Sequence, residues 1–158
     1  MEFIIFVSGV TMKRTKLRMR GVSDSSVLKE QIQATLRELV IKRDKGCILR
    51  HYSNEITPQY RDCGGYRNDG ELILQAEHLH TRSNAASFAD SRLVICLCKR
   101  HHIYYKPQHA DEYYRLVKKH IGAKRTKLLE AMQKDYSPHK VDLKLELLCL
   151  QKELKKCG

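Results

Sequence analysis

The sequence contains no tryptophan, few other aromatic side chains and no long apolar run. Phe, Trp and Tyr together make up 7% of the 158 residues, and no stretch approaches the roughly 20 apolar residues that a transmembrane helix requires. The N-terminal segment is apolar, but it lacks a basic start and its apolar run is too short for a secretory signal peptide. We therefore expect an intracellular protein without a membrane segment, whose cysteines remain reduced.

Acidic residues are also scarce relative to basic ones. The 30 Lys and Arg residues outnumber the 18 Asp and Glu residues, giving a formal net charge of +12. Such a surface favours a polyanionic partner, because each contact with a phosphate releases counterions. Five basic residues and no acidic one occur between positions 13 and 20, namely Lys13, Arg14, Lys16, Arg18 and Arg20. We expect residues 1–24 to form a flexible basic arm that contacts nucleic acid; a solvated tail is the alternative.

The spacing of apolar residues predicts a mixture of helices and two short strands. Leu28, Ile32, Leu36 and Val40 follow one another at helical spacing, which predicts a helix from Ser25 to about Arg43. An irregular segment, 47–70, precedes the predicted strands 72–79 and 93–97, which are separated by a polar loop. Helices are expected at 98–105, 111–120, around Leu128 to Met132, and at 141–156. The fold class is therefore α+β.

Four of the Cys and His residues are spaced as ligands of a structural zinc ion. Two residues separate Cys98 from His101, the usual spacing for one half of a zinc knuckle. The irregular segment starts at Cys47, contains Cys63 and otherwise lacks an anchor. We predict that these four side chains bind zinc; the alternative is that they are unrelated residues, since a free cysteine also packs well as a small apolar side chain.

A second group of polar residues has the chemistry needed for phosphodiester hydrolysis. Glu77 and His78 lie together at the end of the first predicted strand, and His102 directly follows the zinc knuckle. A neutral His78 can accept a proton from an attacking water. Glu77 and His102 can hold one divalent cation, such as Mg²⁺ or Mn²⁺, beside the leaving oxygen. Neighbouring residues of a strand point to opposite faces, so this grouping requires the strand to end or twist there.

At these positions the sequence resembles the HNH endonuclease superfamily, and in particular small phage and prophage members of the recombination-nuclease type. The similarity covers about residues 40–122 and rests on three motifs, Glu77-His78-Leu79, Ser87-Phe88-Ala89-Asp90-Ser91-Arg92 and Leu97-Cys98-Lys99-Arg100-His101-His102. In that family, an Asp-His or His-His pair supplies a metal ligand and the base. The resemblance implies a ββα-metal core with an adjacent structural zinc site, flanked by helices.

One position departs from the family pattern. The middle Asn that gives the family part of its name should follow Arg92, but Leu93 stands there. The resemblance assigns this Asn the task of bracing the loop and the base. Asn84 and Arg92 are candidates to replace it.

Together these features predict an HNH nuclease domain at 25–122 and a C-terminal helical extension at 123–158. The expected activity is metal-dependent cleavage of duplex or branched DNA, with Arg82, Lys99 and Arg100 as further phosphate contacts. Two rival functions remain: a zinc-stabilised DNA-binding module with weak or no catalysis, and an RNA-processing enzyme of the same fold.

Overall fold

The structure is a computed structural model, and it describes residues 24–80, 85–134 and 141–157. The predicted arm, apart from Asp24, and the phosphate-contact candidate Arg82 lie outside the described residues, as does Asn84. The elements, in chain order, are α1 (Asp24–Asp44), η1 (Ile48–Glu55), η2 (Pro58–Tyr60), β1 (Leu74–His78), α2 (Ala85–Phe88), η3 (Ser91–Leu93), β2 (Val94–Cys98), η4 (His101–Tyr105), α3 (Lys106–Gln108), α4 (Ala110–Lys134) and α5 (Leu143–Lys156).

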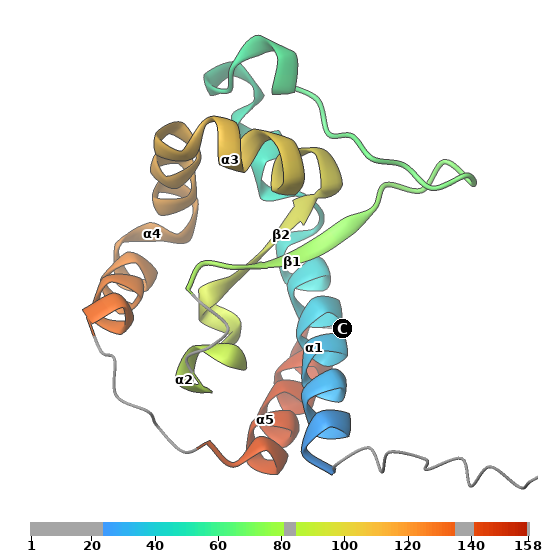
Figure 1. Cartoon of the computed structure of the whole chain (residues 1–158), viewed down its shortest axis with the longest axis vertical. Helices are drawn as coiled ribbons and strands as arrows, with labels where there is room; N and C mark the ends of the chain where they lie inside the picture. Colours follow the sequence, from blue (N-terminus) through green and yellow to red (C-terminus); the bar gives the residue numbers. More distant parts are fainter. Residues whose placement is uncertain (1–23, 81–84, 135–140, 158) are drawn as a thin grey trace, which may run out of the picture.

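The expected α+β class is confirmed. A two-stranded antiparallel sheet pairs Glu77 of β1 with Ile95 of β2, and the helices surround it (Figure 1). Every residue of β2 is buried, because apolar layers cover both of its faces. Ile95 and Leu97 pack in one core cluster with η1 and α4, whereas Val94 and Cys96 pack in another with α1 and α5.

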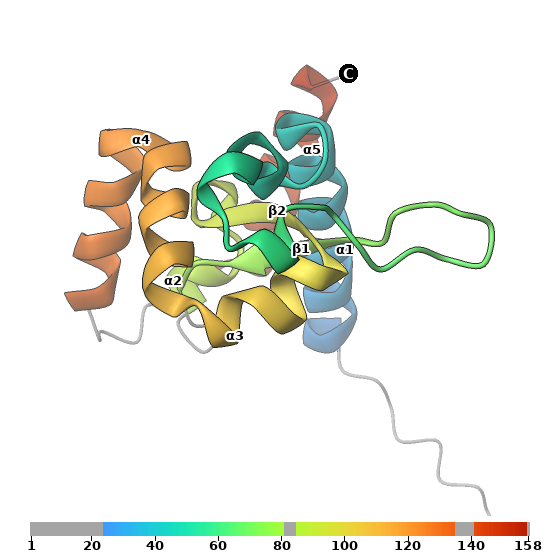
Figure 2. The same ribbon diagram turned by 90° about the horizontal axis from the view of Figure 1, so that it is seen from above.

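The two core clusters define the two sides of the sheet. Figure 2, seen from above, shows α4 on one side of the strands and the α1–α5 pair on the other. Strand alternation distributes the residues of β1 between these sides. Leu74 and Ala76 pack with the α1–α5 cluster, so Gln75 and Glu77 face the opposite way.

The predicted helix at the start of the domain is confirmed as α1, which buries Ile32, Leu36, Leu39 and Val40. It ends where Lys45 and Gly46 adopt positive φ angles of 53° and 112°. The predicted stop at Gly122 is also confirmed, because α4 is interrupted there by a non-helical backbone with φ 75° and ψ 171°. Residues from both parts of α4, including Leu116 before Gly122 and Leu129 after it, still pack in the same core cluster.

A narrow hairpin leads into β1 and projects away from the body of the molecule (Figures 1 and 2). Tyr66 and Leu72 form its isolated bridge, and Gly70 closes the turn by donating its N–H to the carbonyl oxygen of Arg67 at 3.0 Å. At its base the Gly65 carbonyl oxygen accepts the N–H of Ile73 at 2.8 Å. The hairpin thus connects the segment around Cys63 to the strand that carries Glu77.

Candidate metal centre and active site

The four predicted zinc ligands come together. One ligand atom from each of Cys47, Cys63, Cys98 and His101 lies within 4.8 Å of every other one. His101 Nδ1 lies 3.2 Å from the Cys47 sulfur and 3.1 Å from the Cys98 sulfur. A tetrahedral zinc ion with sulfur and nitrogen ligands separates its ligand atoms by about 3.6 Å. The group can therefore hold a structural metal ion such as zinc.

The backbone around the cluster fixes these ligands in place. His101 Nε2 donates to the Tyr60 carbonyl oxygen at 2.7 Å, which leaves the Nδ1 lone pair directed at the sulfurs, as an outer partner of a metal-bound histidine does. The Arg100 N–H donates to the Gly64 carbonyl oxygen at 3.1 Å. The Cys63 and Cys98 segments are thereby held together.

Electrostatics at the cluster also suit a cation. Hydrogen bonds from the Cys47 and Cys63 thiols hold the pKa of Cys98 far below its usual value. Burial works against protonation of His101, but hydrogen bonds to Cys63, Cys98 and the Tyr60 carbonyl raise its pKa to about 10. A metal ion bound here would replace the protons that these groups share, because it needs thiolate sulfurs and a neutral His101.

Glu77 and His102 also meet, from β1 and from the helical turn that follows the cluster. His102 Nε2 lies 2.7 Å from Glu77 Oε2, and the side chain of Glu77 is only 6% exposed. On the other side of its ring, His102 Nδ1 lies 2.5 Å from Gln75 Oε1. The Gln75 amide oxygen can only accept, so it holds the Nδ1 proton and fixes the ring with Nε2 facing the carboxylate.

Lys106, which was not predicted from the sequence, completes this group. Its ammonium group forms a short ion pair with the second carboxylate oxygen, Glu77 Oε1. Two spacings could have revealed the set: Lys106 lies four residues after His102, about one helical turn, and Gln75 lies two residues before Glu77, on the same strand face. Glu77 therefore has a neighbouring cation of its own.

His78 is placed differently from Glu77 and His102. It is the last residue of β1, and its Nε2 lies 3.2 Å from the Phe88 carbonyl oxygen. A carbonyl oxygen can only accept, so Nε2 carries the proton and Nδ1 is the basic nitrogen of the neutral ring. The strand continues through His78, so alternation directs its side chain to the α1–α5 side.

Two clefts flank the helical turn between His101 and Lys106. One, of about 370 Å³, is lined by His102 and Gln75 together with Arg37 and Gln33 of α1. The other, of about 340 Å³, is lined by the phosphate-contact candidates Lys99 and Arg100 together with Tyr60, Gly64, Gly65 and Tyr104. A basic side chain therefore borders each cleft, whereas the tyrosines line only the second one.

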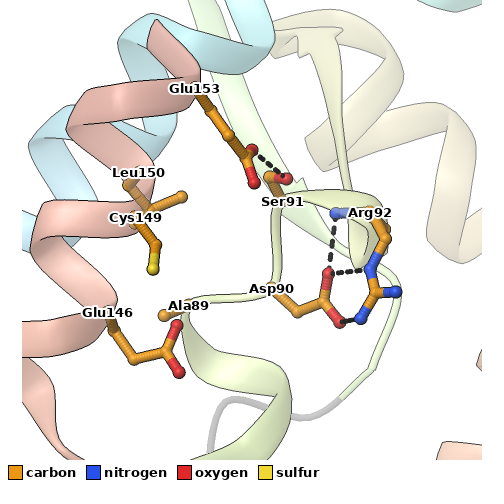
Figure 3. A pocket seen from close by; sticks show the side chains of 8 residues that line it. All are labelled: Ala89, Asp90, Ser91, Arg92, Glu146, Cys149, Leu150 and Glu153. Atoms are coloured by element: carbon orange, nitrogen blue, oxygen red, sulfur yellow. Dashed lines mark hydrogen bonds and ion pairs between the residues drawn. The ribbon is translucent and has the colours of Figure 1, made fainter.

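A further cleft, of about 380 Å³, lies between α5 and the loop before β2. Figure 3 shows Glu146 and Glu153 reaching from α5 towards this loop, where Asp90 pairs with Arg92. Ser91 Oγ donates to Glu153 at 2.7 Å. The carboxylates that line this cleft make it a poor site for a phosphate, and neither His102 nor Glu77 lines it.

The loop at Leu93 is braced by arginines. Arg43 of α1 donates to the carbonyl oxygens of Ser91 and Val94 at 2.7 Å each, and Arg125 of α4 donates to those of Arg92 and Val94 at 2.8 and 3.2 Å. Arg92, one of the expected substitutes for the missing Asn, instead pairs with Asp90. Leu93 itself is fully buried in the core.

Comparison with protein families, curated proteins and solved structures finds no match to this chain. Among the described helices, none has the length and apolarity needed to cross a lipid bilayer.

Proposed function

We propose that this chain is a metal-dependent endonuclease of the HNH type that hydrolyses phosphodiester bonds in DNA. The observation that carries the proposal is the placement of two adjacent histidines. His101 joins the three-cysteine cluster, while His102 reaches the buried carboxylate of Glu77. A zinc ion in the cluster would thereby fix the helical turn that presents His102.

In this proposal Glu77 and His102 hold one divalent cation, Mg²⁺ or Mn²⁺. When bound, that cation would polarise the phosphate and neutralise the leaving oxygen. His78 accepts the proton of the attacking water, a contribution of roughly 10²–10⁴-fold. Since Glu77 and His78 lie on opposite faces of β1, the proposal requires the phosphate to reach both side chains around the end of the strand. Phosphates on either side are contacted by Lys99 and Arg100.

The test is cleavage of supercoiled plasmid, of a branched DNA junction and of RNA by the zinc-loaded full chain, with Mg²⁺ or Mn²⁺. We expect Glu77→Gln and His102→Ala to lose most of the cleavage, with partial rescue of His102→Ala at high metal concentration. His51→Ala is the matched control, because His51 is exposed and distant in sequence from the trio. Undiminished cleavage by Glu77→Gln would overturn the proposal, and preference for RNA would move it to the RNA-processing alternative.

A second candidate, a zinc-stabilised DNA-binding module, is favoured by one specific contact. The Lys106 ammonium group already neutralises Glu77, as it would in a site that has no need of a divalent cation. This candidate requires the zinc cluster and the positive surface but no cleavage. Salt-sensitive binding of duplex DNA, without cutting under any divalent metal, would establish it in place of the nuclease.

A further inference from the structure

The carboxylate of Glu77 is buried and holds two partners at once. Its residue is 4% exposed. His102 Nε2 approaches Oε2, and the Lys106 ammonium group approaches Oε1. A carboxylate taken out of water needs a compensating positive charge. Lys106 supplies that charge from within the chain.

Lys106 is the more accessible member of the pair. Its side chain is 30% exposed, against 6% for that of Glu77, and its Nζ lies 5.8 Å from the centre of the Tyr113 ring. A lysine has a compact charge on a flexible four-carbon stem. The ammonium group can therefore leave the carboxylate for solvent or for another anion, while Glu77 stays buried.

A divalent cation and this ammonium group oppose each other. A cation bound by Glu77 and His102 would lie beside the same carboxylate as Lys106, where like charges repel strongly because little water screens them. A phosphodiester that reaches His102 offers the ammonium group a replacement anion, because His102 and Lys106 contact the same carboxylate. Release of Lys106 by substrate would then open Glu77 to the metal.

We propose that Lys106 is a built-in counter-ion that keeps divalent metal affinity low in the free protein and is drawn off by a bound phosphodiester, so that metal and nucleic acid bind cooperatively. The inference rests on the proposed function for the identity of the ligands. Coupling of this kind is reciprocal: the metal must tighten nucleic acid binding by the same factor by which nucleic acid tightens metal binding.

The experiment is calorimetric titration of Mn²⁺ into the zinc-loaded full chain, alone and with a short phosphorothioate DNA duplex. Without duplex, we expect Lys106→Met to bind Mn²⁺ about tenfold more tightly than the wild type. The duplex should tighten Mn²⁺ binding by the wild type and leave Lys106→Met nearly unchanged. Lys42→Met removes the same charge from the exposed surface of α1, and it should behave as the wild type.

Two further variants locate the effect and guard against misfolding. Adding His102→Ala to Lys106→Met should abolish the gained affinity, which assigns it to this site. Lys106→Gln keeps a polar end of similar length and replaces Lys106→Met if the latter unfolds at a lower temperature; it should show the same gain.

Equal Mn²⁺ affinity in the wild type and in the folded Lys106 variants overturns the inference, as does a duplex that has no effect on the wild type. These readouts do not depend on cleavage. A protein that shows the Mn²⁺ pattern but never cuts DNA retains the inference and loses the nuclease proposal. A protein that cuts DNA but shows no such Mn²⁺ pattern retains the nuclease proposal and loses the inference.

Discussion

At the scale of single residues, Cys63 offers the cleanest test of the metal cluster. It is the one member of the four that is only partly buried, whereas Cys47, Cys98 and His101 are buried. Cys63→Ser removes a ligand with little change in packing. We expect zinc content, measured by elemental analysis, to fall from about one ion per chain, and the free energy of unfolding to fall by more than about 2 kcal/mol.

Cys157→Ser is the matched control for Cys63→Ser, because Cys157 is exposed near the end of α5. It should keep its zinc and its melting temperature. A Cys63→Ser protein with full zinc content and unchanged melting would show that the four residues do not act as a metal site.

The role of His78 can be separated from that of the metal ligands. His78→Ala removes the proposed proton acceptor but neither Glu77 nor His102. We expect Mn²⁺ and DNA affinity to remain close to those of the wild type, while the cleavage rate falls by about 10²–10⁴-fold. Single-turnover cleavage at saturating metal measures this. If the His78→Ala protein cuts as fast as the wild type, another group must accept the proton of the attacking water.

At the scale of elements, the Cys/His cluster depends on Gly65, which lets the segment after Cys63 approach the segment after Cys98 closely. Gly65 has a φ of +89°, and a Cβ built there would lie 2.5 Å from the Cβ of Lys99. Gly70 has a similar φ of +84° with nothing within 4 Å. The two positions therefore share the backbone strain of a substitution but differ in the steric clash.

Gly70→Ala should cost about 1–2 kcal/mol, the penalty of a left-handed backbone. Gly65→Ala should cost that amount and about 1–3 kcal/mol more for overpacking, and it should also weaken zinc binding because the Cys63 and Cys98 segments are forced apart. Denaturant unfolding of both variants, with zinc content measured alongside, gives the comparison. Equal destabilisation of the two variants would mean that the backbone near Gly65 adjusts to the added methyl group, so that close packing there is not required.

The sequence predicts elements better than it predicts their partners. The stripe from Ile32 to Val40 and the break at Gly122 are local patterns, and both are confirmed. The grouping of the three cysteines with His101 could be predicted because cysteine and histidine spacing carries chemical meaning. The Arg43 and Arg125 contacts to the loop before β2 have no such pattern, since an arginine on a helix is usually solvated.

The turn from His101 to Tyr105 shows another limit of local patterns. It is a π-helical turn, which a helical periodicity of 3.6 residues does not predict. Its wider winding accompanies the placement of two adjacent histidines, one at the sulfur cluster and one at Glu77. Adjacent side chains on a helix diverge, and in this case the divergence serves two neighbouring groups.

At the scale of the whole molecule, β2 joins the two halves of the core. One face packs with η1 and α4, which carry the surroundings of the metal cluster, and the other packs with α1 and α5. The C-terminal helix α5 therefore packs along α1, as Figure 1 shows, with Leu150 buried between them. Amphipathic spacing predicted the helix, but it could not identify the surface that the helix covers.

The net charge of +12 leads to a prediction about binding rather than cleavage. Positions 13–20 carry five basic residues and no acidic one; such side chains can contact phosphates but cannot orient a water molecule. Each phosphate contact adds about −0.9 to the slope of log affinity against log salt concentration for duplex DNA. Replacing the five with Ser should therefore flatten that slope by up to about 4.5 units, while the cleavage rate at saturating DNA stays close to that of the wild type. Fluorescence anisotropy across a range of salt concentrations measures the slope. Deletion of residues 1–20 should flatten the slope by the same amount as the five Ser substitutions. An unchanged slope in both variants would show that this segment makes no contact with the phosphates, and the affinity would then have to come from the folded domain.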